Sequence, residues 1–481
     1  MRENKSIENA ERAEKIFKEV RRRLYYPPVT DFEISEESGF IFGRRLKLKI
    51  GEKDLKLPDD ALKGSIALNL NLWASHPYSL KTILLEEFWL RDFEKRSQIR
   101  ALFDEVVAAI DLLLNRGFDE VLDYYRTRKA EGKQDILLYA FLERIAGGEV
   151  SIDESMERKL KEMLEINFLD RREMRLRLNL LRFAKIVDEL IETFSPKIKQ
   201  EDFGEKEMDE ALKELARELD QSEFQELCQL IGKKTTGEVK KPEKIWYMER
   251  SRKYSIYIQP YSMTGSLYPS EIREFEFDGS VEEFSPIDSY GKLIPGIAKK
   301  YAYDDFEGRD FSIPDAVVVI DSSGSMADPS KSISYAVLGA MAVARNYLEN
   351  GARVGVVNFS NENISIPPSR GERVFDAIIL YQGGGTHLDV EGLKNYLRDA
   401  GGVDVIMITD GGIENIEEVS EFTSQLNSLT VIWIKSDVSS DEFSKRIKKI
   451  LKKNVNVFEV KNESDIPSIA VKRFVEVFGR C

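Results

Sequence analysis

The segment Asp321-Ser-Ser-Gly-Ser325 brings one carboxylate and three hydroxyls into five consecutive positions. It directly follows Asp315-Ala-Val-Val-Val-Ile320, a short apolar run that is typical of a buried parallel strand. An amphipathic helix is predicted next, from about residue 332 to residue 348. Carboxylate and hydroxyl oxygens gathered at the carboxyl end of a central strand can bind a hard divalent cation. The sequence therefore predicts a cation site at this turn.

Alternating strands and helices are predicted from residue 312 to residue 481. The candidate strands are 316–320, 352–358, 403–408, 429–434 and 455–460. The candidate helices are 332–348, 370–380, 388–398, 417–427, 441–451 and 468–478. This alternation predicts an α/β domain with a doubly wound, mostly parallel sheet, in which ligands lie beyond the carboxyl ends of the strands.

Taken alone, Asp-x-Ser-x-Ser is also explained as a helix-capping turn, because Ser and Asp favour N-caps. Two further segments favour the cation site. Gly383-Gly-Gly-Thr386 lies in a loop between two predicted helices, and Ile408-Thr-Asp410-Gly-Gly412 ends an apolar strand. With these three segments in this order, residues 312–481 resemble a von Willebrand factor A domain with its metal-ion-dependent adhesion site.

The resemblance implies that the three segments meet at one edge of the sheet. Ser323, Ser325 and Thr386 would bind the ion through their hydroxyls, and Asp321 and Asp410 would hold it directly or through water. We expect Mg²⁺, with Mn²⁺ or Ca²⁺ as alternatives, because hydroxyl-rich sites accept several hard cations. Neutral hydroxyls leave most of the ion's charge uncompensated, so an Asp or Glu of a partner protein can fill an open coordination position.

Each of the two polar residues that follow Thr386, His387 and Asp389, has two possible interpretations. His387 either lies at the rim of the site or is a loop histidine without a ligand role. Asp389 either adds a second charge near the ion or caps the helix that follows.

Composition restricts the class of protein. A chain of 481 residues is too long to fold around a single hydrophobic core, so we expect two or three domains. A net charge of −14 argues against a broad nucleic-acid surface. The two cysteines, Cys228 and Cys481, are expected to be reduced thiols. No apolar run could span a bilayer, and the charged start Met1-Arg-Glu-Asn-Lys5 differs from a signal peptide, so we expect a cytoplasmic protein without membrane insertion.

The rest of the chain is predicted to be mainly helical at first and to contain strands later. Residues 1–240 are expected to form a helical region with a small β excursion near 31–57, and residues 241–311 a β-containing connector with strands at 254–259 and 272–277. The clearest helical patterns cover 6–25, 97–114, 118–131, 134–145 and 171–194.

Sequence motifs of common enzymes are missing. There is no Gly-x-x-x-x-Gly-Lys-Ser/Thr loop and no Gly-x-Ser-x-Gly elbow. A helix at 63–78 resembles in shape a helix of metallopeptidase-like proteins that also end in a von Willebrand A domain. However, Leu68, Asn69 and Leu72 stand where a His-Glu-x-x-His motif would bind zinc, and the chain has only two histidines, His76 and His387. We therefore expect a protein that is not an enzyme.

The layout of a long helical region before a C-terminal von Willebrand A domain resembles the ViaA-like and CoxE-like proteins, which work with MoxR-type AAA+ ATPases. This implies a non-catalytic adaptor or co-chaperone whose metal binds an acidic residue of the ATPase or of a client protein. Two alternatives remain, a Ro-like RNA-binding protein and an accessory subunit of a metal chelatase. The acidic net charge weighs against the first, and the absence of an acidic, Pro-rich linker weighs against the second.

Overall fold

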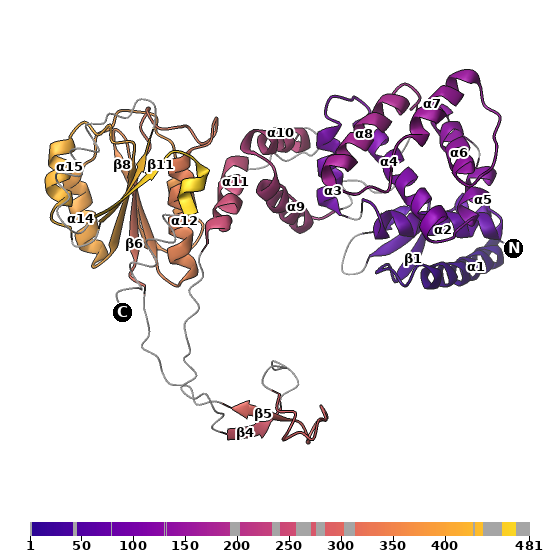
Figure 1. The fold of residues 1–481 in the computed structure, drawn as a ribbon, viewed down its shortest axis with the longest axis horizontal. Helices are drawn as coiled ribbons and strands as arrows, with labels where there is room; N and C mark the ends of the chain where they lie inside the picture. The colour runs from indigo at the N-terminus through magenta and orange to yellow at the C-terminus, as the bar shows by residue number, and fades with distance from the viewer. Residues whose placement is uncertain are drawn as a thin grey trace. The chain divides into compact units, whose positions relative to one another are not determined.

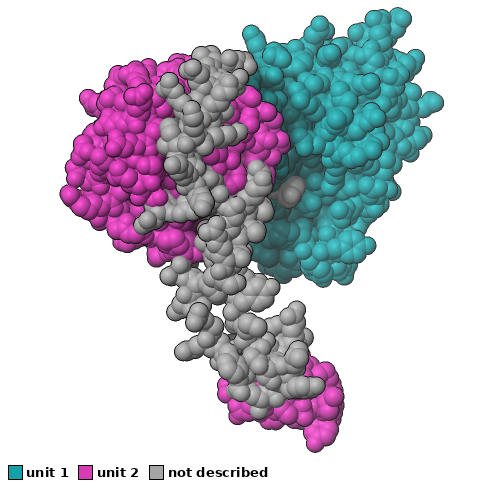
Figure 2. Space-filling view, turned by 60° about the vertical axis from the view of Figure 1, so that its left-hand side comes forward, with its two compact units in different colours: residues 1–246 teal, residues 247–481 magenta. Residues whose placement is uncertain are grey.

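The computed structural model divides the chain into two compact units, Met1–Trp246 and Tyr247–Cys481, which are described separately below (Figure 2). The residues that the structure describes are 2–41, 46–77, 79–128, 130, 132–192, 203–232, 241–255, 271–275, 284–302, 313–426, 429–435 and 455–467. The division falls within helix α11 (Pro242–Ser251), close to the boundary expected at residue 240. Residues 247–311 belong to the same unit as residues 312–481.

The N-terminal unit is mainly helical, and the described helices include those predicted from apolar spacing. They are α1 (Arg2–Arg23), α2 (Asp59–Ala74), α3 (Leu80–Trp89), α4 (Arg96–Ile110), α5 (Glu120–Thr127), α6 (Lys133–Ile145), α7 (Glu154–Leu164), α8 (Glu173–Val187), α9 (Glu205–Glu218) and α10 (Gln221–Gly232) (Figure 1). The helix expected over 118–131 ends at Thr127, and the one expected over 171–194 ends at Val187. Residues 193 and 194 lie outside the described residues.

The β excursion expected near 31–57 is a three-stranded sheet. Its order is β1 (Asp31–Ser35), β3 (Lys47–Gly51) and β2 (Gly39–Ile41), with β1 parallel and β2 antiparallel to β3. Helix α2 lies next in the chain and is buried on nearly every side, from Ala61 to Leu72. A helix that is apolar around most of its circumference packs in the interior, so α2 is a core helix of this unit.

The C-terminal unit contains a six-stranded mixed sheet, which confirms the α/β class. Its order is β11 (Val455–Val460), β10 (Leu429–Ile434), β9 (Asp404–Thr409), β6 (Ala316–Asp321), β7 (Val354–Phe359) and β8 (Asn363–Ser369). The five predicted strands are all present and pair in parallel. Strand β8 pairs antiparallel with β7 and was not predicted. It contains Pro367 and Pro368, which a sheet tolerates at an edge strand but not in its centre.

Helices cover both faces of this sheet (Figure 1). Alternate residues of β6, β7, β9 and β10 form one hydrophobic core with α14 (Val390–Ala400) and α15 (Ile416–Thr423). On the other face, α12 (Tyr335–Glu349) packs against β6, and α13 (Arg373–Ile378) packs against β7. Two predicted helices, 441–451 and 468–478, lie outside the described residues.

The connector contributes two described strands. β4 (Glu271–Glu274) and β5 (Lys299–Ala302) pair antiparallel. Most of the strand predicted at 254–259 lies outside the described residues, and Tyr254 itself ends a 3₁₀ turn.

Two further observations concern the chemical character of the described residues. No helix among them is both long and apolar enough to cross a membrane. Cys228 is a buried free thiol, while Cys481 lies outside the described part of the chain.

Candidate metal site

Asp321 is the last residue of β6 and the first residue of the candidate site. Its carboxylate is buried, with an exposed fraction of 2%. Oδ1 accepts a hydrogen bond from the Ser323 backbone N–H at 3.0 Å, and Oδ2 accepts one from the Thr409 hydroxyl at 2.7 Å. Thr409 ends β9, the neighbouring strand, so two strands fix the orientation of this carboxylate at the carboxyl edge of the sheet.

Ser323 and Ser325 place their hydroxyl oxygens side by side. The two Oγ atoms lie 3.1 Å apart, with Ser323 buried and Ser325 exposed. Two adjacent ligands of an octahedral Mg²⁺, each at about 2.1 Å from the ion, are about 3.0 Å apart. The pair therefore has the separation that one Mg²⁺ requires, with one hydroxyl open to solvent.

Backbone hydrogen bonds join the Gly383–Thr386 loop directly to the Asp321–Ser325 turn. The Gly383 N–H donates to the Ser322 carbonyl at 2.9 Å, and the Gly324 N–H donates to the Gly384 carbonyl at 2.8 Å. Gly383 has a φ of +70°, a conformation that glycine adopts without strain. The paired backbones bring Gly383 and Gly384 to the turn, and Thr386, two residues further along the same loop, is buried.

Asp410 follows β9 directly and is also buried. Its Oδ1 accepts from the Gly412 N–H at 2.9 Å, and its backbone carbonyl accepts from the Trp433 indole at 3.0 Å. Burial, the largest cause, and the charge of Asp410 raise the pKa of Asp321, although hydrogen bonds from Ser323 and Thr409 oppose this. Two carboxylates held close in a buried place repel each other, and a bound cation would relieve that repulsion.

The three predicted segments therefore lie together at one edge of the sheet. Their donor atoms, hydroxyl and carboxylate oxygens, fit a hard divalent cation such as Mg²⁺. His387 has an exposed side chain, and its backbone N–H donates to the Ser360 carbonyl. Asp389 is the N-cap of α14, because its Oδ1 accepts from the Gly392 N–H at 2.9 Å, which supports the capping interpretation.

Three residues that shape this edge were not predicted from the sequence as parts of the site. The Ser360 hydroxyl donates to the Gly385 carbonyl at 2.8 Å and accepts from the Gly384 N–H at 3.1 Å. The Glu414 N–H donates to the Thr386 carbonyl at 2.8 Å, which places a further carboxylate beside the loop. Ser360 directly follows β7, Thr409 ends β9, and Glu414 lies a few residues beyond β9. Inspecting every strand end for polar residues would have found them.

Ser325 offers a test of the hydroxyl pair. Ser325→Ala removes one exposed candidate ligand, so the Mg²⁺ affinity is expected to fall roughly tenfold, while the free energy of unfolding of the metal-free protein stays within about 0.5 kcal/mol. Isothermal titration with Mg²⁺ measures the first, and chemical denaturation in EDTA the second. Ser424→Ala, an exposed hydroxyl just beyond α15, is the control and should bind as the wild type does. Equal affinity in both variants would exclude Ser325 as a ligand.

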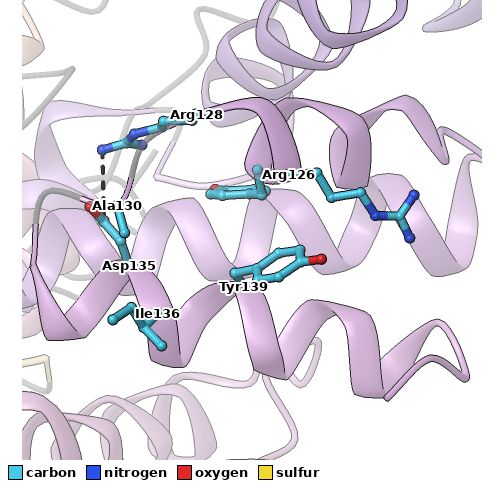
Figure 3. A pocket seen from close by; sticks show the side chains of 7 residues that line it. Arg126, Arg128, Ala130, Asp135, Ile136 and Tyr139 are labelled. Carbon is cyan, nitrogen blue, oxygen red and sulfur yellow. Dashed lines mark ion pairs between the residues drawn. The ribbon is translucent and has the colours of Figure 1, made fainter. Parts of the chain in front are cut away.

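A pocket in the N-terminal unit is a weaker candidate for a binding site (Figure 3). Its volume is about 210 Å³, and its lining is Tyr125, Arg126, Arg128, Ala130, Asp135, Ile136 and Tyr139. Arg128 pairs with Glu105 at 3.5 Å and with Asp135 at 3.7 Å, and Arg126 pairs with Glu143 at 2.7 Å. Both cations are already neutralised by carboxylates, so the pocket has little attraction for an anionic ligand.

Searches of protein-family models, of curated proteins and of solved structures find no match to this chain.

Proposed function

We propose that residues 312–481 form a von Willebrand A-type domain that binds Mg²⁺, or Mn²⁺ or Ca²⁺, at the turn after β6. The observation that carries the proposal is the pair of Ser323 and Ser325 hydroxyls, 3.1 Å apart, beside the buried carboxylates of Asp321 and Asp410. The strand order supports it, because counting from β6 gives 3-2-1-4-5-6, the order of doubly wound sheets that bind ligands at the carboxyl edge.

The site is suited to binding rather than to catalysis. The Ser323 hydroxyl hydrogen-bonds with the Ser325 hydroxyl and with the Asp321 carboxylate, which gathers the oxygen atoms that a hard cation needs. Hydroxyls leave the ion electrophilic, and an acidic side chain of another protein can complete its coordination. We therefore assign the chain as a non-catalytic, metal-dependent protein-interaction adaptor or co-chaperone in the cytoplasm.

The partner that we propose is a MoxR-type AAA+ ATPase, or a client protein presented to it. The support is the layout of a helical N-terminal unit before the α/β unit, together with the three motif segments. One carboxylate–metal contact cannot supply a whole interface, because association costs several kcal/mol in lost freedom of motion. The metal acts instead as a switch that completes an interface when it is bound.

Partner capture from native lysate tests this function. Wild type, Asp321→Ala and Asp315→Ala are each immobilised with Mg²⁺ and with EDTA, and bound proteins are identified by mass spectrometry. Asp315 is the matched control, because it lies at the opposite end of β6 and bonds to Arg353. We expect a AAA+ ATPase only with wild type and Asp315→Ala, and only with Mg²⁺.

Two results would contradict the proposal. Equal recovery of the ATPase in all samples would show that the metal does not control the interface. Bound structured RNA without an ATPase, with salt-dependent affinity, would favour the Ro-like alternative. Thermal unfolding of Asp321→Ala in EDTA confirms beforehand that the variant is folded.

A further inference from the structure

The N-terminal unit contains a second group of metal-ligating side chains. His76 lies just after α2, Glu86 lies on α3, and Asp104 lies on α4. Their exposed fractions are 4%, 0% and 2%. Each offers one ligand atom, and these atoms all lie within 4.8 Å of one another. One imidazole and two carboxylates from three elements thus converge in the interior.

The distances within this group are close to those around a tetrahedral ion. The His76 Nε2 lies 2.6 Å from Glu86 Oε1 and 3.4 Å from Asp104 Oδ1. Two ligands at about 2.1 Å from a tetrahedral Zn²⁺ lie about 3.4 Å apart. The His76–Asp104 pair already has this separation, and the His76–Glu86 pair would have to open by about 0.8 Å.

Two carboxylate oxygens in the group accept no hydrogen bond from an N–H or hydroxyl donor, and the Glu86 and Asp104 carboxyls lie within hydrogen-bond reach of each other. The two oxygens are Glu86 Oε2 and Asp104 Oδ1, and both are inaccessible to solvent. Buried polar atoms nearly always find a partner, because losing water without a replacement costs about 1–3 kcal/mol for each group. Both atoms belong to side chains that converge on His76, so either a proton shared by the two carboxyls or a cation bound by Glu86 and Asp104 would satisfy them.

A metal that displaces protons from these carboxyls would meet a net negative charge. Glu86, Glu87 and Asp104, if ionised, carry three negative charges against the single positive charge of buried Arg100, which leaves two negative charges. Arg100 Nη1 donates to Asp104 Oδ2 at 2.5 Å, and Arg100 Nε lies 3.6 Å from Glu87 Oε1. Arg171 also acts on the group but is exposed, where water and salt screen its charge. A divalent cation would offset the remaining charge.

Aromatic side chains pack against one side of the His76, Glu86 and Asp104 group. The His76 ring packs edge-on against Phe103, with ring centroids 6.0 Å apart, and Phe103 contacts Phe168 and Phe183. These rings keep water away and strengthen the attraction between an ion and its ligands. Three protein ligands leave one position of a tetrahedral ion for a further ligand, and these rings limit the access of solvent to it.

We infer that His76, Glu86 and Asp104 bind one first-row divalent transition-metal ion, with Zn²⁺ as the reference ion. An imidazole ligand suits these ions better than Mg²⁺ or Ca²⁺. The ion would join the turn after α2 to α3 and α4 and so stabilise the N-terminal unit. This site is separate from the one proposed in the C-terminal unit and does not rest on the proposed function.

Protons would compete with a metal ion for the ligand atoms of this group. Burial raises the pKa of Glu86 to about 8, so this carboxyl can hold a proton near neutral pH, and burial and the neighbouring Glu86 also raise the pKa of Asp104. Burial lowers the pKa of His76, which keeps the imidazole neutral with a lone pair for a proton or for a metal. Metal and protons would use the same atoms, so direct binding measurements separate the two.

The two histidines of the chain make a matched pair for the test. Full-length protein without a histidine tag is stripped with chelator and titrated with Zn²⁺ and, separately, with Co²⁺, whose visible absorption reports nitrogen and oxygen ligands. His76→Gln is expected to bind at least about 100-fold more weakly, since even indirect partners of metal ligands contribute 10–100-fold. His387→Gln, at an exposed loop, is expected to bind as the wild type does. Asp321→Ala, measured in parallel, removes binding at the C-terminal site and should keep the Co²⁺ absorption.

The wild type alone can overturn the inference, whether or not His76→Gln folds. We expect one equivalent of Zn²⁺ to raise the thermal unfolding midpoint of the wild type and of Asp321→Ala, and chelator to reverse the rise. Absence of Zn²⁺ and Co²⁺ binding by the wild type would show that protons alone occupy the group. Binding of equal strength by folded His76→Gln would place the ion elsewhere.

Discussion

Gly64→Ala is expected to lower the free energy of unfolding of the N-terminal unit by about 3 kcal/mol. Gly64 lies in α2 where this helix packs against α5. A Cβ atom at this position would lie 2.7 Å from the carbonyl carbon of Glu120 and 3.0 Å from the Cβ of Tyr124. The first contact is with backbone, which cannot rotate away, so the two helices must separate. The higher helix propensity of Ala, worth at most about 1 kcal/mol, is too small to compensate.

Gly339→Ala is the matched control for this prediction. Gly339 lies in α12, and a Cβ there would have no neighbour within 4 Å. The same substitution should therefore stabilise the protein by up to about 1 kcal/mol through helix propensity. Hydrogen exchange of α2 and α5 peptides, with chemical denaturation, measures the effect of Gly64→Ala. Protection equal to that of the wild type would mean that these helices do not approach as closely as the structure shows.

The meeting of the three polar segments in the C-terminal unit could be predicted from sequence because the segments follow strands or lie in a glycine-rich loop. Asp321 and Asp410 end or follow apolar runs that had to be neighbouring strands, and parallel strands present their carboxyl ends at one edge. The run of three glycines before Thr386 indicated a close backbone approach. Local signals therefore predicted the edge of the sheet at which these segments meet.

The group around His76 gave no such signal. Its members are separated by 10 and 18 residues and lie on three different elements, so no motif joins them. A search for His-Glu-x-x-His considers ligands on one helix and passes over ligands that only tertiary packing brings together. The inventory of histidines rightly counted two, but it could not show that one of them lies against two buried carboxyls.

Contacts between elements explain two features that the sequence of a single element does not show. Gly64 looks like a residue that weakens a helix, yet its missing side chain is what allows α2 to approach α5. Strand β8 was hidden by its two prolines, because a local rule against proline in strands does not apply at a sheet edge. Helices and central strands follow from periodicity, whereas edges and close contacts depend on the neighbours that the fold provides.

Asn358 is expected to control the C-terminal site without binding the ion. It is fully buried near the end of β7. Its Oδ1 accepts from the Ser322 hydroxyl at 2.6 Å and from Gln382 Nε2 at 2.9 Å, and its Nδ2 donates to the Ala377 and Leu380 carbonyls at 3.1 and 2.7 Å. One amide thus joins the turn that carries Ser323 to the segment that leads into the glycine loop.

Asn358→Ala should therefore lower both stability and metal affinity. Two carbonyls lose a buried donor, so we expect about 3 kcal/mol less free energy of unfolding. The Mg²⁺ affinity should fall at least about tenfold, because misplacing Ser323 relative to Thr386 disrupts ligand geometry. Asn363→Ala, which removes only bonds to the backbone of Asp389, should change each quantity little. Titration with Mg²⁺ and denaturation in EDTA measure both effects. Unchanged affinity with lowered stability would limit Asn358 to a structural role, because the ligands would then hold their places without this amide.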